Sequence, residues 1–304
     1  MSLNKKNIID YFHSGSKLHN KCGIGIEYEK FLFYEKNNQR IKYESIVEMF
    51  KELYEFGWKP VYEEQNIIAL IKGNKNITLE PGNQIELAGE KLNNIHEACT
   101  ESQDYLFELK QVTKKLNIKI VSSGFDPFSK LSEVSLNPKK RYALMTKEMP
   151  KDGHLSLDMM YRSCGTQINL DYISESDFSK KFFVANRIVP IIISLFANSS
   201  IVEKKDSKFL SYRSYVWQNT SRGGLPEIFL ENMDFEKYTD FIINYPVLFI
   251  QKNENYLNPN GKTFKDFMNG KIDGVGTPSK KDLTNHLSAI FTENRLKKYI
   301  EVRS

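Results

Sequence analysis

The sequence is poor in cysteine, and its three cysteines, Cys22, Cys99 and Cys164, lie far apart. This spacing excludes a disulfide framework and a cysteine-rich zinc site, because both need sets of neighbouring cysteines. The five histidines also show no metal-ligand spacing. Cys164 is expected to be a small structural residue, since no histidine motif accompanies it. A reducing compartment, the cytoplasm, is the expected location.

Long apolar runs are also missing. The longest candidate, residues 188–197, is too short to span a bilayer and contains a proline. The first 15 residues lack the apolar stretch of a secretory signal. Neither a P-loop nor a GxGxxG motif before a helix is present. We therefore expect no membrane partner, and any nucleotide would have to bind through a metal ion and a sheet.

Arginine is scarce as well, although the formal net charge is +5. Basic residues are scattered and acidic residues nearly match them in number, which argues against a nucleic-acid partner. Only eight of the 43 basic residues are arginine, so lysine serves as the general surface cation. An arginine is then expected where a planar fork must grip a carboxylate or phosphate.

Hydrophobic periodicity predicts alternating helices and strands without internal repeats. The expected strands are 22–34, 67–71, 75–79, 84–87, 119–123, 165–172 and 298–302. The expected helices are 5–12, 43–56, 93–116, 155–161, 177–197, 238–243, 264–268 and 279–291, and residues 124–141 are expected to be a loop. The Pro81-Gly82 turn makes residues 61–87 a meander, which implies an antiparallel sheet. The predicted fold is α+β: a single catalytic domain, residues 1–304, with helices on the back of the sheet and the site on its open face.

Acidic residues recur with a period of two in several of these strands. Glu27 and Glu29 project to one side of an extended strand, as do Gln84 and Glu86 in the meander. Carboxylates gathered on one face repel one another unless a cation lies between them, and hard oxygen ligands suit Mg²⁺, which commonly brings phosphates with it. The pattern indicates a metal and nucleotide site, while a solvated strand edge remains the alternative.

Two further segments carry polar residues suited to a ligand. Gln167, Asn169 and Asp171 share one face of a strand, where a row of amides suits an amino-acid ligand or the outer shell of a metal. Arg213 lies among aromatic residues in LSYRSYVW, which suits an arginine that grips a substrate carboxylate in an aromatic-walled pocket. A solvated sheet face and an amphipathic segment over the core are the respective alternatives.

Five motifs, taken in order, resemble those of the plant and proteobacterial type of glutamate–cysteine ligase, whose catalytic core is similar to glutamine synthetase. They are GIEYEKF, ITLEPGNQIELAGE, KKRYALMTKEMPKDGHLSLDMMYRSCGTQINLDY, FLSYRSYVW and RLKKYIEVR, and the resemblance runs from about residue 20 to the end. It implies ATP- and Mg²⁺-dependent joining of the glutamate γ-carboxylate to the amine of cysteine through γ-glutamyl phosphate. That reaction is the first step of glutathione biosynthesis.

The resemblance also implies roles for individual residues. Glu27, Glu29 and Glu86 would hold Mg²⁺, Glu29 and Arg303 would act in catalysis, and Glu301 and Arg303 would meet the nucleotide. Arg141, Gln167, Arg213 and Trp217 would bind substrate, with Arg213 on a carboxylate of glutamate and Trp217 as a pocket wall.

Two departures from the family pattern affect what to expect. Asn83 stands where family members usually have glycine, so the turn is expected to differ slightly. The chain stops one residue after its Glu-x-Arg motif, whereas the family continues, so we expect a truncated product or a partner chain that completes it. Two alternatives to the ligase follow: a γ-glutamyl ligase with another amine acceptor, and a non-catalytic subunit that binds ATP or glutamate.

Overall fold

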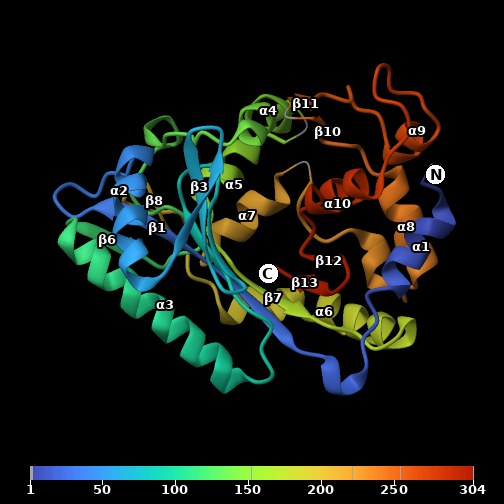
Figure 1. The fold of residues 1–304 in the computed structure, drawn as a ribbon, viewed down its shortest axis with the longest axis horizontal. Coiled ribbons are helices and arrows are strands. Elements are labelled where there is room, and N and C mark those ends of the chain that lie inside the picture. The colour runs from blue at the N-terminus through green and yellow to red at the C-terminus, as the bar shows by residue number, and fades with distance from the viewer. Residues whose placement is uncertain (1–2, 152, 221, 254, 304) are drawn as a thin grey trace.

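A nine-stranded sheet runs through the middle of the molecule (Figure 1). The structure, a computed structural model, describes residues 3–151, 153–220, 222–253 and 255–303. The strands are β1 (Ile24–Tyr34), β2 (Lys59–Glu63), β3 (Asn66–Lys72), β4 (Lys75–Leu79), β5 (Ile85–Ala88), β6 (Ile118–Val121), β7 (Thr166–Leu170), β12 (Asn294–Leu296) and β13 (Ile300–Val302). Their order is β12-β13-β7-β1-β5-β4-β3-β2, with β6 paired to the far part of β1. The pairs are antiparallel, which confirms the predicted sheet.

Ten α-helices, five short 3₁₀ helices and two small hairpins complete the described part of the chain. The helices are α1 (Lys5–His13), α2 (Tyr43–Leu53), α3 (Ile95–Lys115), α4 (Lys140–Glu148), α5 (Ser156–Arg162), α6 (Glu175–Leu195), α7 (Tyr212–Gln218), α8 (Phe235–Asn244), α9 (Phe264–Met268) and α10 (Lys280–Ser288). The hairpins are β8 (Ile201–Val202) with β9 (Lys205–Asp206), and β10 (Ile250–Lys252) with β11 (Asn255–Leu257). None of the described helices is long and apolar enough to cross a membrane.

One face of the sheet is covered by α2 and α3, as predicted for the back of the sheet (Figure 1). Ile77 and Leu87 of the sheet pack there against Phe50 of α2 and Leu109 of α3, and all four side chains are fully buried. A second core of aromatic side chains joins α1, α6 and α8 at the other end of the molecule. Burial of such aromatic side chains dominates the energetics of a core.

The opposite face of the sheet is covered too, so the expected open face is wrong. A third cluster of apolar side chains from α4, α5 and α7 lies over it, with Met145, Met160 and Trp217 among its members. The expected loop at 124–141 is wrong at its end, because α4 already begins at Lys140. These short helices gain their stability from packing on the sheet rather than from a strong periodic pattern.

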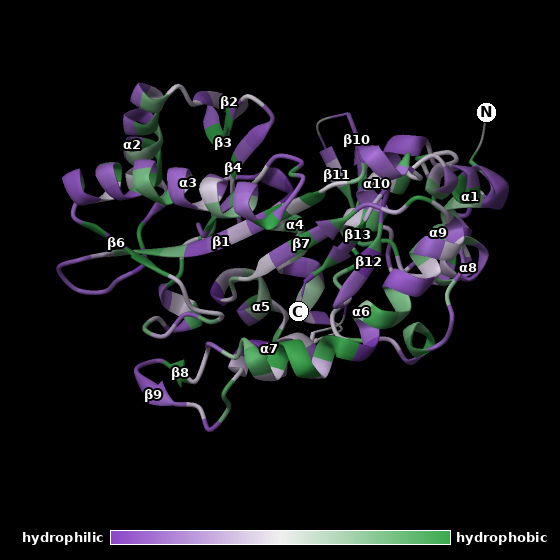
Figure 2. Ribbon diagram, turned by 90° about the horizontal axis from the view of Figure 1, so that it is seen from below, coloured by the Kyte–Doolittle hydropathy of each residue, from purple (hydrophilic) through white to green (hydrophobic). Residues whose placement is uncertain are grey.

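Helix α6 differs from the other helices in being apolar on more than one side (Figure 2). Phe178 and Phe182 are fully buried in the aromatic core, whereas Val184, Ile191 and Leu195 are 54%, 57% and 71% exposed. Its apolar composition therefore exceeds what its contacts within the described chain require.

Candidate active site

Three glutamates meet on the face of the sheet that α4, α5 and α7 cover. Glu29 of β1 lies directly opposite Glu86 of β5, and Glu86 in turn lies opposite Thr78 of β4. Glu80 follows Thr78 by two residues and therefore shares its face. One carboxylate oxygen of each of Glu29, Glu80 and Glu86 lies within 4.8 Å of the other two. We call these three residues the carboxylate cluster.

The carboxylate cluster concentrates negative charge where little water reaches it. Burial, and then the neighbouring Glu80, raises the pKa of Glu29 to about 7. Burial also raises the pKa of Glu86 well above its usual range, with Glu80 and Glu27 adding repulsion. Carboxyl groups that repel one another in this way hold protons or a cation. Three hard oxygen donors at this separation fit a divalent cation such as Mg²⁺.

Backbone and side-chain donors orient Glu29 within the cluster. The N–H of Gly165 donates to its Oε2 at 2.6 Å, and Gln167 Nε2 lies 3.5 Å from its Oε1. A Cβ at position 165 would lie 2.9 Å from Arg213 Nη2, so a side chain there would displace the guanidinium. Gly165 thus lets a carboxylate and a guanidinium approach the same stretch of backbone.

Glu27 lies beside the cluster without belonging to it. Its Oε1 accepts a hydrogen bond of 2.7 Å from Asn169 Nδ2 on β7, the next strand of the sheet. Its negative charge still contributes to the raised pKa of Glu86. The structure therefore places Glu27 on the same face of the sheet, one step from the three grouped carboxylates.

Glu301 and Arg303 lie together at the end of β13. Arg303 Nη1 donates to Glu301 Oε1 at 2.6 Å and to Gln167 Oε1 at 2.5 Å. Glu301 is fully buried and also pairs with Arg295 at 2.6 Å and Lys297 at 2.7 Å. Burial alone would raise the pKa of Glu301, but these three cations hold it well below its usual range. Glu301 is thus a permanent carboxylate that fixes Arg303 beside the pocket.

Trp217 of α7 lies between two guanidinium groups. Arg213 lies 5.1 Å and Arg303 5.3 Å from the centre of its ring, within the range of cation–π attraction. Arg213 Nη2 also donates to the carbonyl of Arg303 at 3.0 Å. The Nε atoms of both arginines and of Arg141 are buried without a hydrogen-bond partner in the described chain. Buried cationic donors of this kind suit an anionic ligand.

These elements line a small pocket of about 80 Å³ between the sheet and the helices α4, α5 and α7. Its lining combines carboxylates, arginines and apolar side chains: Glu29, Glu80, Gln84, Arg141, Tyr142, Met145, Met159, Met160, Trp217, Phe249, Phe291 and Arg303 among others. A lining that combines carboxylates, guanidinium groups and apolar side chains suits a ligand that carries charged and apolar parts.

Comparison with known proteins decides the family. The model of glutamate-cysteine ligase family 2 (GCS2) matches residues 23–304. The chain belongs to this family. It is 40% identical over 307 residues to "Glutamate--cysteine ligase, chloroplastic" of Medicago truncatula, covering 99% of this chain and 60% of that protein. The protein of the same name from Arabidopsis thaliana is 39% identical over 307 residues, with 99% and 59% covered.

The chain therefore spans about 60% of the length of the curated relatives that it matches. Among solved structures, it is similar to one described as "Apo GmaS without ligand", with a TM-score of 0.28 and 11% sequence identity. That match covers 60% of this chain and 41% of the other. A likeness at this level carries no argument about fold or function.

In this member of glutamate-cysteine ligase family 2, the structure brings most of the sequence-predicted site residues together. Glu29, Arg141, Trp217 and Arg303 line the pocket. Glu86 adjoins it through the cluster, Gln167 through Arg303, and Arg213 through Trp217. Their individual roles remain predictions.

The sequence pattern did not predict Glu80 as a metal ligand. The available signal was the hairpin register. The five residues 80–84 connect the paired Leu79 and Ile85, and this register places Glu80 on the same face as Glu86.

Proposed function

We propose that this chain catalyses the ATP-dependent ligation of glutamate to cysteine. The chain spans about 60% of the length of its curated relatives, so the activity of those whole proteins is a proposal for this chain. Relatives named glutamate–cysteine ligase support it, as does family membership. The observation that carries the proposal is that Glu29 and Glu80 of the carboxylate cluster line one pocket together with Arg141 and Arg303, whose Nε atoms are buried without a hydrogen-bond partner in the described chain. This arrangement suits a cation, polyphosphate and amino-acid substrate held together.

Mg²⁺ fits the carboxylate cluster, and in our proposal Glu29, Glu80 and Glu86 hold it, with Glu27 nearby. The raised pKa values of Glu29 and Glu86 support this, because a cation relieves the repulsion that raises them. When bound, Mg²⁺ would neutralise charge on the phosphates of ATP.

The protein's own residues would then position the reactants. Arg213 and Arg141 bind the carboxylates of glutamate, and Trp217 forms the pocket wall against which the substrate packs. Held in line, the γ-carboxylate of glutamate attacks the γ-phosphorus of ATP, which gives γ-glutamyl phosphate and ADP. Arg303, near the nucleotide with Glu301 behind it, stabilises the negative charge of the transferring phosphoryl group.

The second half-reaction needs an amine nucleophile. The amine of cysteine attacks the acyl carbon of γ-glutamyl phosphate, phosphate leaves, and the amine proton passes to solvent or to a basic group. We keep cysteine as the acceptor because the relatives' names specify it. We propose the cytoplasm as location, which suits three cysteines that are free in the structure. No nucleic-acid or membrane partner is proposed.

The test is release of ADP from Mg²⁺-ATP and glutamate, with cysteine and then with other amines. The expected result is release that depends on cysteine. Release with a different amine alone would support a γ-glutamyl ligase of other acceptor specificity. No release with any amine, combined with ATP or glutamate binding by calorimetry, would support a non-catalytic binding subunit.

A variant pair ties the activity to the carboxylate cluster. Glu29→Gln is expected to lower kcat at least 100-fold, since a neutral amide cannot replace a metal-binding carboxylate. Glu35→Gln is the matched control, because Glu35 is exposed just after the same strand. Wild-type kcat and Mg²⁺ dependence in Glu29→Gln would exclude the metal-site interpretation.

A further inference from the structure

Arg40 is a buried arginine that belongs to none of the motifs and does not line the pocket. It follows β1 and forms an isolated bridge with Phe33 of that strand. Its side chain is 1% exposed, and the carboxylate of Asp126, 3.1 Å away, is fully buried. Enclosing a guanidinium so completely is costly unless each contact is used. The contacts of Arg40 therefore indicate what it is for.

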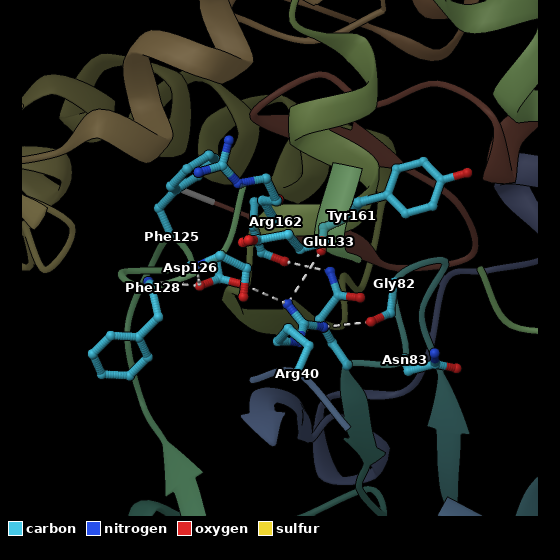
Figure 3. A network of polar contacts seen from close by, with 12 residues as sticks. Arg40, Gly82, Asn83, Phe125, Asp126, Phe128, Glu133, Tyr161 and Arg162 are labelled. Atoms are coloured by element: carbon cyan, nitrogen blue, oxygen red, sulfur yellow. Dashed lines mark hydrogen bonds and ion pairs between the residues drawn. The ribbon is translucent and has the colours of Figure 1, made fainter. Parts of the chain in front are cut away.

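The guanidinium of Arg40 joins three separate segments of the chain (Figure 3). Nη2 donates to the carbonyl of Gly82, and Nη1 donates to the carbonyl of Tyr161 at 3.4 Å as well as to Asp126 Oδ2 at 3.1 Å. Its face lies 4.7 Å from the ring centre of Phe31. Two backbone carbonyls and one carboxylate thus share a single planar fork.

Each of the two carbonyls belongs to a segment that carries part of the carboxylate cluster. Gly82 lies in the turn between Glu80 and Glu86. Tyr161 lies at the end of α5, four residues before Gly165, whose N–H holds Glu29. Arg40 therefore links the backbone that sets Glu80 and Glu86 to the backbone that orients Glu29.

A second link runs parallel to the first. Gln84 Nε2 donates to the carbonyls of Met160 at 3.2 Å and Ser163 at 2.9 Å. The two segments also pack too closely for a larger residue at position 82, where a Cβ would lie 2.5 Å from the carbonyl oxygen of Tyr161. Close packing at Gly82 thus fixes the distance between the turn and the end of α5, and the guanidinium of Arg40 is the charged group that bridges them.

Asp126 holds Arg40 in this orientation. Its Oδ1 accepts the N–H groups of Phe128 at 2.8 Å and Ser129 at 2.9 Å, while Oδ2 receives the guanidinium. These three donors hold the side chain of Asp126 in one orientation. The arginine is therefore fixed from the side opposite to the turn.

We propose that Arg40 is a positioning residue that sets the spacing of the carboxylate cluster by clamping the Gly82 turn to the end of α5. This inference rests on the proposed divalent-cation site. A lysine would preserve the charge but offers a point-like ammonium instead of a fork, so it cannot hold both carbonyls and Asp126 in one plane. Loss of the clamp lets the turn carrying Glu80 move relative to Glu29, and cation binding depends steeply on ligand spacing.

The test measures divalent-cation affinity without requiring turnover. Mn²⁺ binding to the full chain is titrated by electron paramagnetic resonance, with Mg²⁺ as competitor, for wild type, Arg40→Lys and the matched control Arg162→Lys. Arg162 is equally buried and charged, but its ion pairs go to Asp158 and Glu203 instead of the turn. We expect the Kd for Mn²⁺ to rise at least tenfold in Arg40→Lys and less than twofold in Arg162→Lys. The Tm of both variants is measured as well, so that a general loss of stability can be told from a loss of cation binding.

The outcomes separate this inference from the proposed metal site. Wild-type Mn²⁺ binding that Glu86→Gln does not weaken would overturn the site itself. Binding that Glu86→Gln weakens and Arg40→Lys leaves unchanged would overturn only the role of Arg40. If Arg40→Lys does not fold, Asp126→Asn takes its place, with an expected three- to tenfold rise in Kd; an unchanged Kd in that variant also overturns the inference.

Discussion

The environment of each carboxylate, more than its residue type, decides its state. Glu29 and Glu86 lie among other carboxylates, and burial together with those neighbours raises their pKa values. Glu301 is even more deeply buried, yet three cations hold its pKa low. Glu29 and Glu86 therefore suit a bound cation, whereas Glu301 is already neutralised by cationic side chains of the protein.

Glu80 should matter to cation binding as much as the glutamates of the strands. We predict that Glu80→Gln raises the Kd for Mn²⁺ at least tenfold, similar to Glu86→Gln, because each supplies one oxygen of the cluster. Titration by electron paramagnetic resonance measures this, with Glu35→Gln as control. An unaltered Kd in Glu80→Gln would remove Glu80 from the site.

The raised pKa of Glu29 predicts how stability depends on pH in the absence of metal. Its pKa rises from 4.5 to about 7 on folding, so the native chain keeps a proton that the unfolded chain loses. The free energy of unfolding should therefore fall as pH rises from 4.5 through 7. Glu29→Gln removes this contribution, on the order of 2 kcal/mol across the interval.

Urea denaturation in EDTA at several pH values measures this effect. Relative to Glu29→Gln, wild type should lose unfolding free energy from pH 4.5 to pH 7.5, whereas Glu35→Gln should run parallel to wild type. Parallel curves for all three proteins would show that Glu29 keeps an ordinary pKa.

At the level of elements, the sequence predicted the long and strongly patterned ones well. Helices α3 and α6 and strands β1 and β4 were placed within a few residues. Helix α7 was not predicted as a helix, because its seven residues are aromatic-rich and gain their order from burying Val216 and Trp217. The same holds for β12, whose three residues become a strand through pairing with β13.

The turn between β4 and β5 shows how a local departure is accommodated. Asn83 has a φ of +62°, the left-handed conformation that glycine adopts freely and asparagine tolerates. The turn closes with Glu80 N–H and Gln84 O 2.9 Å apart. Asn83 Nδ2 also donates to Ser135 O at 3.0 Å and to its Oγ at 3.1 Å. Asparagine thus keeps the glycine-like turn and adds a link to the loop.

These two roles of Asn83 can be separated by substitution. We predict that Asn83→Gly costs about 1 kcal/mol through its lost hydrogen bonds, and that Asn83→Ala costs about 1 kcal/mol more through left-handed strain. Urea denaturation measures both. Asn253→Gly is the control, since Asn253 is also left-handed but exposed. Equal stability of the Gly and Ala variants would show that backbone strain does not contribute.

Over the whole molecule, the site is assembled from the two ends of the chain. Strand β7 lies between β1 near the start and β13 near the end, and Gln167 faces Glu27 on one side while its side chain bonds Arg303 from the other. Alternation could predict which residues share a face, but not which strands are neighbours. The sequence therefore could not show that Glu80 joins the carboxylate cluster while Glu27 lies beside it, because membership depends on strand pairing that only the folded sheet displays.

Glu301 connects the sheet to the helical end of the molecule, so loss of its charge should lower the unfolding free energy of the whole fold. Its partner Arg295 also donates to the carbonyls of Ser288, the last residue of α10, at 2.9 Å and of Ile290 at 2.8 Å. Glu301→Gln leaves buried cations without their counter-ion, and we predict a loss of about 3 kcal/mol or more in unfolding free energy. Glu236→Gln, which breaks an exposed pair with Lys5, should cost less than about 0.5 kcal/mol.

The fluorescence of two tryptophans allows the unfolding of Glu301→Gln to be followed separately in two cores. Trp58 lies in the core under α2 and α3, and Trp217 lies over the site face. Fluorescence-detected urea unfolding of Glu301→Gln, in Trp58→Phe and Trp217→Phe backgrounds, follows each core alone. If the ion cluster couples sheet and helices, both transitions shift by the same amount, because one cooperative unit loses one shared contact. A shift at Trp217 alone would mean that the sheet under α2 and α3 folds independently of the ion cluster, and that the two halves of the site meet only after each has folded.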